Sequence, residues 1–219
     1  MDNCKDILIA SLTSLNIEFS EIQIELLLKF LALIEKWNKT YNLTAIRDKS
    51  EMARLHIVDS LDILPFLHGQ RYLDVGTGAG LPGIPLAIFK PQQTFVLLDS
   101  NAKKTRFIQQ VIVELNLKNI EIQTQRVENY YPPLLFNQIL TRAFADTEMM
   151  LKLTAHLLAD QGEWLAMKSQ PSAEELHSSF AFIEKIDLDI PQLNAHRCLL
   201  KIKPINRDYL SIIRSETHS

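Results

Sequence analysis

A carboxylate followed by three glycines at alternate positions is the pattern in this chain with the clearest chemistry. An apolar run ends in Asp74, and Gly76, Gly78 and Gly80 follow it. Glycine has no Cβ, so it accepts the positive φ angles of a tight turn and lets the backbone approach a ligand closely. Two prolines just beyond suit the first turn of a helix. A strand, a glycine turn and a helix in this order predict a site for a nucleotide-type cofactor.

The spacing of the glycines alone also fits a dinucleotide site. Gly78, Gly80 and Gly83 satisfy the pattern G-x-G-x-x-G. Asp99 stands near the place of the acid that binds a ribose in that pattern. Asp74 argues against NAD, because its charge would repel a pyrophosphate, whereas it suits a ligand with an ammonium group, a cationic centre and no phosphate. The pattern therefore favours S-adenosylmethionine over NAD, and a turn that serves packing alone is the third alternative.

The composition is that of a folded protein of ordinary size. The chain has 219 residues, of which 47% are hydrophobic and 22% charged, and this fits one domain or a core with a small appendage. No apolar run approaches the ~20 residues that span a bilayer, and the first residues lack the basic region of a signal peptide. Two cysteines, Cys4 and Cys198, are too few for a disulfide framework. We expect a reduced, cytoplasmic protein that is monomeric and does not bind membranes.

The net charge of −3 argues against general affinity for nucleic acids. Its distribution is uneven, however, because residues 36–54 hold five basic side chains against two acids and residues 197–214 hold five against one. The first group comprises Lys36, Lys39, Arg47, Lys49 and Arg54. A modest basic face on an acidic body can hold a few phosphates, and ordinary surface charge is the alternative.

Residues 1–66 are predicted to be a helical extension. Ser20 and Gln23 fit a capping box, and apolar residues recur at helical spacing from Ile22 to Trp37. A polar segment follows, and a second helix is predicted over residues 50–64, where Pro65 stops it. Residues 67–219 then form the second predicted unit, a catalytic core.

Beyond Gly69 strands and helices alternate along the chain. The predicted strands cover residues 72–75, 94–98, 120–123, 138–141, 163–168, 182–188 and 196–202. The predicted helices cover residues 81–89, 102–115, 146–158 and 172–180. This alternation predicts an α/β fold with a doubly wound, mostly parallel sheet of seven strands, whose ligands bind at the carboxyl ends of the strands.

Polar residues that follow successive strands should share one rim of this sheet. They are Asp74, Asp99, Glu128, Arg142 and Lys168. Asp99 can accept hydrogen bonds from ribose hydroxyls, or it can cap the helix predicted at residue 102, a role that Ser100 and Asn101 can share. Glu128 follows Arg126 in a loop that flanks the adenine in this architecture, and a solvated loop acid is the alternative.

The rim lacks the groups that several other methyl transfers need. Enzymes that methylate exocyclic amines place Asn-Pro-Pro-aromatic after the fourth strand, where this chain reads Thr141-Arg-Ala-Phe-Ala-Asp146. No cysteine has a rim position suited to attack on cytosine C5. A ring nitrogen such as guanine N7 is already an unprotonated nucleophile, so the reaction needs in-line positioning and no general base. We therefore assign no catalytic base.

The histidines do not form a metal site, because none of the six pairs with cysteine at ligand spacing. His56 is predicted to lie on a helix close to Asp59 and Ser60. We interpret it as a residue that packs the helix or anchors a loop in preference to one that contacts RNA.

Six segments with motifs extend over nearly the whole chain. They are Trp37–Thr44, His56–Ser60, Asp74–Leu86, Leu97–Ser100, Arg126–Glu128 and Arg142–Ala145. Together they resemble the glucose-inhibited division protein B family, the small-subunit ribosomal RNA methyltransferases of type G. Gly80-Leu-Pro-Gly-Ile-Pro85 is the most specific of these motifs, and the residues after Lys203 are the least similar to the family.

The resemblance implies a class I, Rossmann-like methyltransferase with S-adenosylmethionine as the donor. The implied acceptor is N7 of a guanine in a decoding-region loop of 16S rRNA, free or in the small ribosomal subunit. Matching the motifs places cofactor contacts on Gly76, Leu81, Val127, Glu128 and Arg142, and the residue chemistry adds Asp74, Gly78, Gly80 and Asp99. Position and charge suggest RNA contacts at Asn42, Arg47, Arg126, Lys168 and Arg197. An NAD-dependent oxidoreductase and a non-catalytic ribosome-assembly factor with this fold are the open alternatives.

Overall fold

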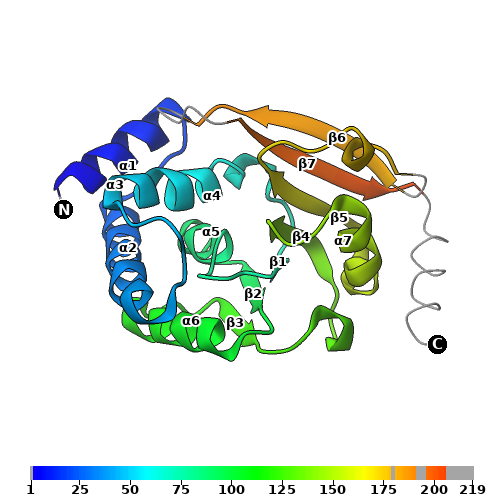
Figure 1. Ribbon diagram of the computed structural model, residues 1–219, viewed down its shortest axis with the longest axis horizontal. Coiled ribbons are helices and arrows are strands. Elements are labelled where there is room, and N and C mark those ends of the chain that lie inside the picture. The colour runs from blue at the N-terminus through cyan, green and yellow to red at the C-terminus, as the bar shows by residue number, and fades with distance from the viewer. Residues whose placement is uncertain (1, 179–180, 191–195, 206–219) are drawn as a thin grey trace.

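A seven-stranded sheet with helices on both faces forms the centre of the computed structural model, which describes residues 2–178, 181–190 and 196–205 (Figure 1). The strands are β1 (Arg71–Val75), β2 (Thr94–Leu98), β3 (Ile120–Gln123), β4 (Phe136–Arg142), β5 (Leu158–Lys168), β6 (Ala181–Leu188) and β7 (Arg197–Pro204). Their order in the sheet is β3-β2-β1-β4-β5-β7-β6. Strands β1 to β5 are parallel to one another, and β7 lies antiparallel between β5 and β6. The predicted mostly parallel sheet is confirmed.

Side chains of alternating direction along the strands build one hydrophobic cluster on each face. Phe95 and Leu97 of β2 belong to the cluster under α5 (Gly83–Phe89) and α6 (Ala102–Leu115), whereas Val96 and Leu98 belong to the cluster under α7 (Thr147–Thr154). The strands therefore bury both faces, which is what a near-continuous apolar run such as Phe95–Leu98 predicts.

The chain before the sheet is helical, as predicted. It forms α1 (Asp2–Ser14), α2 (Glu21–Tyr41), α3 (Lys49–Met52), a π-helical segment Ala53–Val58, α4 (Asp59–Leu61) and a 3₁₀ turn Leu64–Phe66. The capping box is confirmed, because the Ser20 hydroxyl accepts from the Gln23 amide and the Gln23 side chain accepts from the Ser20 amide. None of the helices in the described part of the chain is long and apolar enough to cross a membrane.

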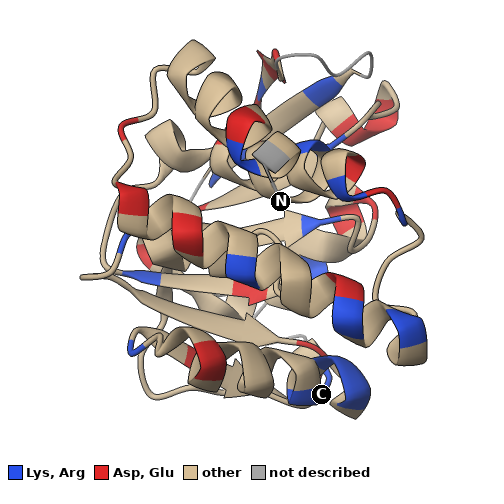
Figure 2. Cartoon of the chain, turned by 90° about the vertical axis from the view of Figure 1, so that its left-hand side faces the viewer, with Lys and Arg blue, Asp and Glu red and all other residues tan. Residues whose placement is uncertain are grey.

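The helical extension packs on the face of the sheet that carries α5 and α6. Buried side chains of α1 and α2, such as Leu8, Leu27 and Phe30, share a hydrophobic cluster with Phe107 of α6. The Phe30 and Phe107 rings stack at 6.4 Å, and the Trp37 ring lies 5.6 Å from that of Phe107. Figure 2 shows the result, with α2 crossing the middle of the molecule above α6.

Two predicted helices differ from the structure. The helix expected over residues 146–158 ends at Thr154 and continues as the 3₁₀ turn Ala155–Leu157, because β5 already begins at Leu158. The helix expected over residues 172–180 is wrong, since the described residues there form only the 3₁₀ turn Glu174–Leu176. The Glu175 side chain bonds to Lys168 at the end of β5, and this contact fixes a compact turn in place of a helix.

Candidate cofactor and substrate site

The three alternating glycines form a tight turn between β1 and α5, as predicted. Gly76, Gly78 and Gly80 have φ angles of 68°, 60° and 81°, a region that L side chains rarely adopt. The amides of Gly76 and Thr77 donate to the carbonyl oxygen of Leu98, at 2.8 Å and 3.2 Å. These bonds attach the turn to the carboxyl end of β2.

Asp74 holds the two ends of this turn together. Its Oδ2 accepts hydrogen bonds from the Thr77 hydroxyl at 2.6 Å and from the Gly83 amide at 2.9 Å. The side chain is 1% exposed, and its Oδ1 is buried with no hydrogen-bond partner among the described residues. Burial raises the pKa of Asp74 to about 6, although the bonds from Thr77 and Gly83 lower it. A buried carboxylate oxygen is thus left for a cationic ligand.

Asp99 joins the end of β2 to the glycine turn. Its Oδ2 accepts from the Gly78 amide at 3.0 Å and lies 3.6 Å from Nζ of Lys104, and its Oδ1 accepts from the Asn101 amide at 2.9 Å. The alternative role as helix cap belongs to Asn101, whose side chain accepts from the Lys103 amide. Asp99 is therefore not the N-cap of α6.

A cavity of about 390 Å³ opens beside Asp99 at the carboxyl ends of β1, β2 and β4. Four predicted cofactor contacts line it, namely Gly76, Asp99, Val127 and Glu128. Arg126, predicted for RNA, lines the same cavity, as do Lys104 and Phe144, which were not predicted. Phe144 belongs to the segment Arg142–Ala145, so its motif pointed to it, whereas Lys104 is identified only by its approach to Asp99. We name this space the cofactor cavity.

Gly80 and Leu81 support the turn from behind. A Cβ on Gly80 would lie 2.3 Å from Cδ1 of Ile84, so glycine lets the turn pack closely on α5. Leu81 is buried in the hydrophobic cluster on that face of the sheet. The structure thus places Leu81 in the packing of the turn, and its contact with a cofactor stays a prediction.

A second cavity, of about 280 Å³, adjoins the first. Arg142, Lys168 and Arg197 line it together with Asp59, and Ala143 lines both cavities. Ala143 has a φ of 51°, and strained backbone of this kind concentrates at functional sites. Three predicted site residues with positive charge therefore lie beside the cofactor cavity, in a space that we name the cationic cavity.

Arg142 connects β4 to the helical extension. Its Nη2 donates to the carbonyl oxygen of Leu55 at 3.0 Å and lies 3.3 Å from Nδ1 of His56, while its Nη1 lies 3.4 Å from Oδ2 of Asp59. Nε of Arg197 donates to Oδ1 of Asp59 at 3.1 Å. Arg142 was predicted to contact the cofactor, and the structure places its side chain in the cationic cavity.

His56 anchors a loop, which confirms the preferred interpretation of this residue. Its Nε2 lies 2.9 Å from the Thr44 hydroxyl, and its other ring nitrogen faces Arg142. Burial, and secondarily the charge of Arg142, lower the pKa of His56 to about 4. The ring is therefore neutral at physiological pH and serves as a fixed hydrogen-bonding partner between the loop and Arg142.

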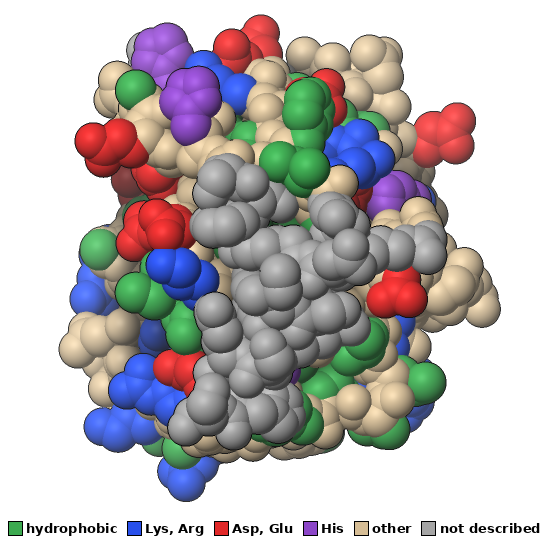
Figure 3. All heavy atoms as spheres, turned by 90° about the vertical axis from the view of Figure 1, so that its right-hand side faces the viewer, with side chains coloured by type: hydrophobic (Ala, Val, Ile, Leu, Met, Phe, Trp, Pro, Cys, Tyr) green, Lys and Arg blue, Asp and Glu red, His purple; other side chains and the backbone are tan. Residues whose placement is uncertain are grey.

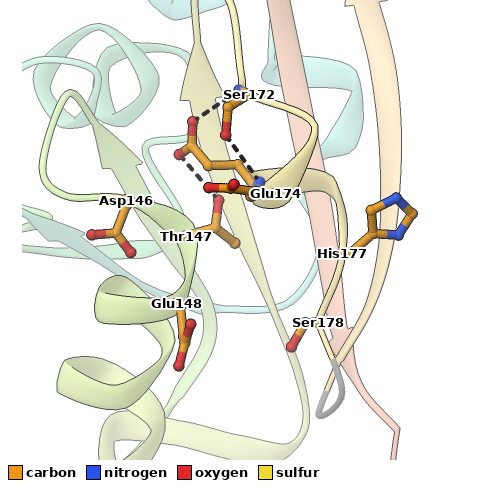
Figure 4. A pocket seen from close by; sticks show the side chains of 8 residues that line it. Asp146, Thr147, Glu148, Ser172, Glu174, His177 and Ser178 are labelled. Atoms are coloured by element: carbon orange, nitrogen blue, oxygen red, sulfur yellow. Dashed lines mark hydrogen bonds between the residues drawn. The ribbon is translucent and has the colours of Figure 1, made fainter.

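Lys168 is held at the end of β5 by two oxygen atoms. Its Nζ donates to the carbonyl oxygen of Ala145 at 2.7 Å and to the carboxylate of Glu175. Burial acts to raise the pKa of Glu175, but the bonds from Lys168 and Ser172 outweigh it and lower that pKa. Figure 4 shows the cavity next to this turn, which Asp146, Thr147 and Glu148 at the start of α7 line together with Ser172, Glu174, His177 and Ser178.

The remaining predicted RNA contacts lie outside both cavities. Asn42 and Arg47 are exposed in the loop after α2, where Nη2 of Arg47 donates to Oδ1 of Asn42 at 3.1 Å. Arg207 and Arg214, which contribute to the second basic segment of the sequence, lie outside the described residues. Within the described ranges no group of three His, Cys, Asp or Glu side chains is arranged to hold a metal ion.

Adjacent ends of α2 and α6 carry a group of exposed basic side chains, which we name the basic edge. It consists of Lys36, Lys39, Lys103 and Arg106. The contact of the Trp37 and Phe107 rings keeps these two helix ends together. Figure 2, a view onto α2 and α6, shows basic residues along the ribbon at its lower right. Figure 3, the view from the opposite side of the molecule, shows basic side chains at its lower left. Lys104, in the same turn of α6, lines the cofactor cavity.

Solved structures identify the class of the fold. Magnesium protoporphyrin IX methyltransferase of Synechocystis PCC 6803, solved with bound S-adenosylmethionine, aligns with a TM-score of 0.58 and 13% identity over 80% of this chain and 97% of that one. Precorrin-6y C5,15-methyltransferase of Geobacter metallireducens aligns with a TM-score of 0.53 and 13% identity over 67% and 86%. The fold is that of a class I, Rossmann-like methyltransferase.

Sequence comparison then gives the family. The family model GidB, described as rRNA small subunit methyltransferase G, matches residues 23–199. Relatives with the name ribosomal RNA small subunit methyltransferase G include a protein of Hydrogenovibrio crunogenus, 52% identical over 81% of this chain and 83% of its own length. A second, from Nitrosococcus oceani, is 48% identical over 91% and 95%. The chain belongs to the GidB family, and the predicted family and methyltransferase class are confirmed.

Proposed function

We propose that the protein transfers the methyl group of S-adenosylmethionine to N7 of a guanine in the decoding-region loop of 16S rRNA. The observation that carries this proposal is the pair of adjoining cavities, one with the carboxylates of a cofactor site and one with three cations, joined at Ala143. Membership of the GidB family supports ribosomal RNA as the substrate. The reaction would take place in the cytoplasm with a monomeric enzyme, in which residues 1–66 are an extension of the catalytic core.

The residues of the cofactor cavity fit S-adenosylmethionine. Asp99 lines the cavity, and its carboxylate has lone pairs left for the ribose hydroxyls. Asp74 does not line the cavity, but its buried and unpartnered Oδ1 at the end of β1 suits the ammonium group of S-adenosylmethionine. The glycine turn brings backbone close to the ligand, and Val127 and Phe144 offer apolar surface to a purine ring. When bound, the cofactor supplies an electrophilic methyl group.

The cationic cavity fits the acceptor. Arginine and lysine donate hydrogen bonds to O6 of guanine and to flanking phosphates, and three such side chains line this space. Guanine N7 carries a lone pair at neutral pH, so no side chain needs to remove a proton before transfer. The task of Arg142, Lys168 and Arg197 is then to hold the base so that N7, the methyl carbon and the sulfur are in line.

The basic edge would bind the phosphate backbone around the target loop. We expect Lys39→Gln, Lys103→Gln and Arg106→Gln, combined in one protein, to weaken binding to small ribosomal subunits roughly tenfold. The slope of log K against log salt should fall by about 0.9 for each lost phosphate contact. Filter binding at several salt concentrations measures both quantities.

A matched control for the basic edge neutralises three lysines elsewhere on the surface. Lys5, Lys118 and Lys185 lie on α1, after α6 and on β6, so Lys→Gln at these positions changes the net charge equally. Equal loss of affinity in the two triple variants would show that only net charge matters, and it would remove the basic edge from the proposal.

The proposed reaction is tested on 16S rRNA from a strain in which the gene is deleted. Chemical cleavage at 7-methylguanosine followed by primer extension should show one cleavage site that is lost on deletion and restored by the purified protein with S-adenosylmethionine. A cleavage pattern that is the same with and without the gene would refute the proposal, and a non-catalytic role in ribosome assembly would then be the better explanation.

A further inference from the structure

The carboxylate of Asp59 lies between two arginines of the cationic cavity. Its Oδ2 is 3.4 Å from Nη1 of Arg142, and its Oδ1 accepts from Nε of Arg197 at 3.1 Å. The Asp59 side chain is 3% exposed, whereas those of Arg142 and Arg197 are 23% and 22% exposed. Asp59 thus fixes one side of each guanidinium group, and both arginine side chains stay partly exposed where they line the cationic cavity.

The three residues come from distant parts of the chain. Asp59 is the first residue of α4, directly after the π-helical segment Ala53–Val58, while Arg142 ends β4 and Arg197 begins β7. π-Helical turns are rare in proteins, and those that do occur are often found at functional sites. The helical extension therefore supplies one wall of the cationic cavity and the only carboxylate that lines it among the described residues.

A purely structural role explains this arrangement poorly. Burying a carboxylate between two cations seldom stabilises a protein more than apolar packing does, because each group loses its hydration. A fixed carboxylate does restrict where the guanidinium groups can lie, and catalysis that depends on alignment needs such restriction. We propose that Asp59 is a positioning residue that holds Arg142 and Arg197 in the orientation that receives the target guanine. This inference rests on the proposed function.

The two arginines depend on Asp59 to different degrees. Arg142 keeps contacts with the Leu55 carbonyl oxygen and with His56 if Asp59 is lost. Among the described residues, Arg197 then retains only the bond from Nη1 to the carbonyl oxygen of the adjacent His196, at 3.0 Å. Removal of the Asp59 charge should therefore displace Arg197 more than Arg142. Because the arginines align the bound guanine, we expect kcat to fall more than KM rises.

Asp59→Asn tests this in the full chain, with small ribosomal subunits that lack the modification and tritiated S-adenosylmethionine. We expect kcat to fall roughly 30- to 100-fold, the size of effect that a displacement of about 1 Å produces, while KM for the subunit changes less than fivefold. Asp59→Glu keeps the charge but moves it, so its kcat should lie between those of the wild type and Asp59→Asn. Circular dichroism checks that each variant is folded.

Asp62→Asn is the matched control. Asp62 lies about one turn further along, is also buried, and lines neither of the two cavities. Its substitution removes a carboxylate from the same region without touching either arginine, so kcat should stay within twofold of the wild type. Equal losses in Asp59→Asn and Asp62→Asn would overturn the proposal.

A double-mutant cycle shows whether Asp59 acts through Arg197. In an Arg197→Gln background, Asp59→Asn should reduce kcat by less than threefold, because the arginine that depends most on Asp59 is already gone and Arg142 keeps its contacts with Leu55 and His56. A full further loss would contradict the mechanism. Wild-type protein that forms no 7-methylguanosine refutes the proposed function itself. Wild-type protein that forms it, with Asp59→Asn equally fast, refutes the positioning role alone.

Discussion

Asparagine in place of Asp74 should abolish useful binding of S-adenosylmethionine and leave the unliganded protein at least as stable as the wild type. Loss of one partner from a buried charge pair weakens binding by about 2–5 kcal/mol, or roughly 30-fold to several thousandfold. Asparagine keeps an oxygen that can accept from the Thr77 hydroxyl and the Gly83 amide. Isothermal titration calorimetry with the cofactor measures the loss.

The expected stability follows from the raised pKa of Asp74, which is about 6 in the folded protein, whereas the ordinary pKa of an aspartate side chain is 3.8. The folded state binds this proton more tightly than the unfolded chain does. The contribution of the carboxyl to stability is therefore complete below pH 3.8 and is lost as the pH rises through about 6. At neutral pH the buried charge costs about 3 kcal/mol, an order-of-magnitude figure, and asparagine removes this cost.

Urea unfolding of both proteins between pH 4 and pH 7 isolates this effect, because other titrating groups are common to the two. The free energy of unfolding of the variant should rise relative to that of the wild type as the pH increases across this range. Thr77→Val is the control, since it removes one hydrogen bond to Asp74, costs about 1 kcal/mol and keeps the charge. Cofactor affinity of Asp74→Asn equal to that of the wild type would contradict the assigned role of the carboxylate.

Alanine at Gly83, the first residue of α5 directly after the glycine turn, should be strongly destabilising. The new Cβ would lie 2.2 Å from Cδ2 of Leu97 and 2.8 Å from Oδ2 of Asp74. Both neighbours are buried, so the turn must shift and the bond from the Gly83 amide to Asp74 must weaken. We expect the free energy of unfolding to fall by about 3 kcal/mol, the upper part of the range for overpacking, and cofactor binding to fall with it.

Alanine at Gly78 is the comparison for this prediction. Gly78 has a positive φ, but a Cβ there meets no atom nearer than the Gly76 carbonyl oxygen at 3.9 Å. The change should cost about 1 kcal/mol, the price of a left-handed conformation in an L residue. Thermal unfolding monitored by circular dichroism ranks the two variants, and a larger loss for Gly78→Ala would show that backbone conformation outweighs packing in this turn.

Much of the fold follows from local sequence. The capping box of Ser20 and Gln23, the α6 boundaries and the positions of the seven strands depend on neighbouring residues and on apolar runs, and all were predicted correctly. The cluster of Gly76, Asp99, Val127 and Glu128 was also predictable, because residues that follow parallel strands must meet at one rim.

Features that depend on distant contacts were not predictable. Asp59 was noted only as a neighbour of His56, and its ion pairs join residues up to 138 positions apart. The turn at Glu174–Leu176 replaces the predicted helix because Glu175 bonds to Lys168 on β5. The hydrogen bond from the Gly83 amide to Asp74 was not predictable either, because the sequence does not show that this amide lies close to the end of β1.

The packing of α1 and α2 on α6 has a consequence for synthesis of the chain. These helices leave the ribosome before α5 and α6, yet their apolar side chains, among them Leu27 and Phe30, share a cluster with residues of those two later helices. Until residue 115 has emerged, the part of that apolar surface that packs on α5 and α6 in the folded protein lacks its full cover. The nascent protein therefore passes through an interval in which this apolar surface is exposed, and aggregation is avoided only if α5 and α6 follow without delay.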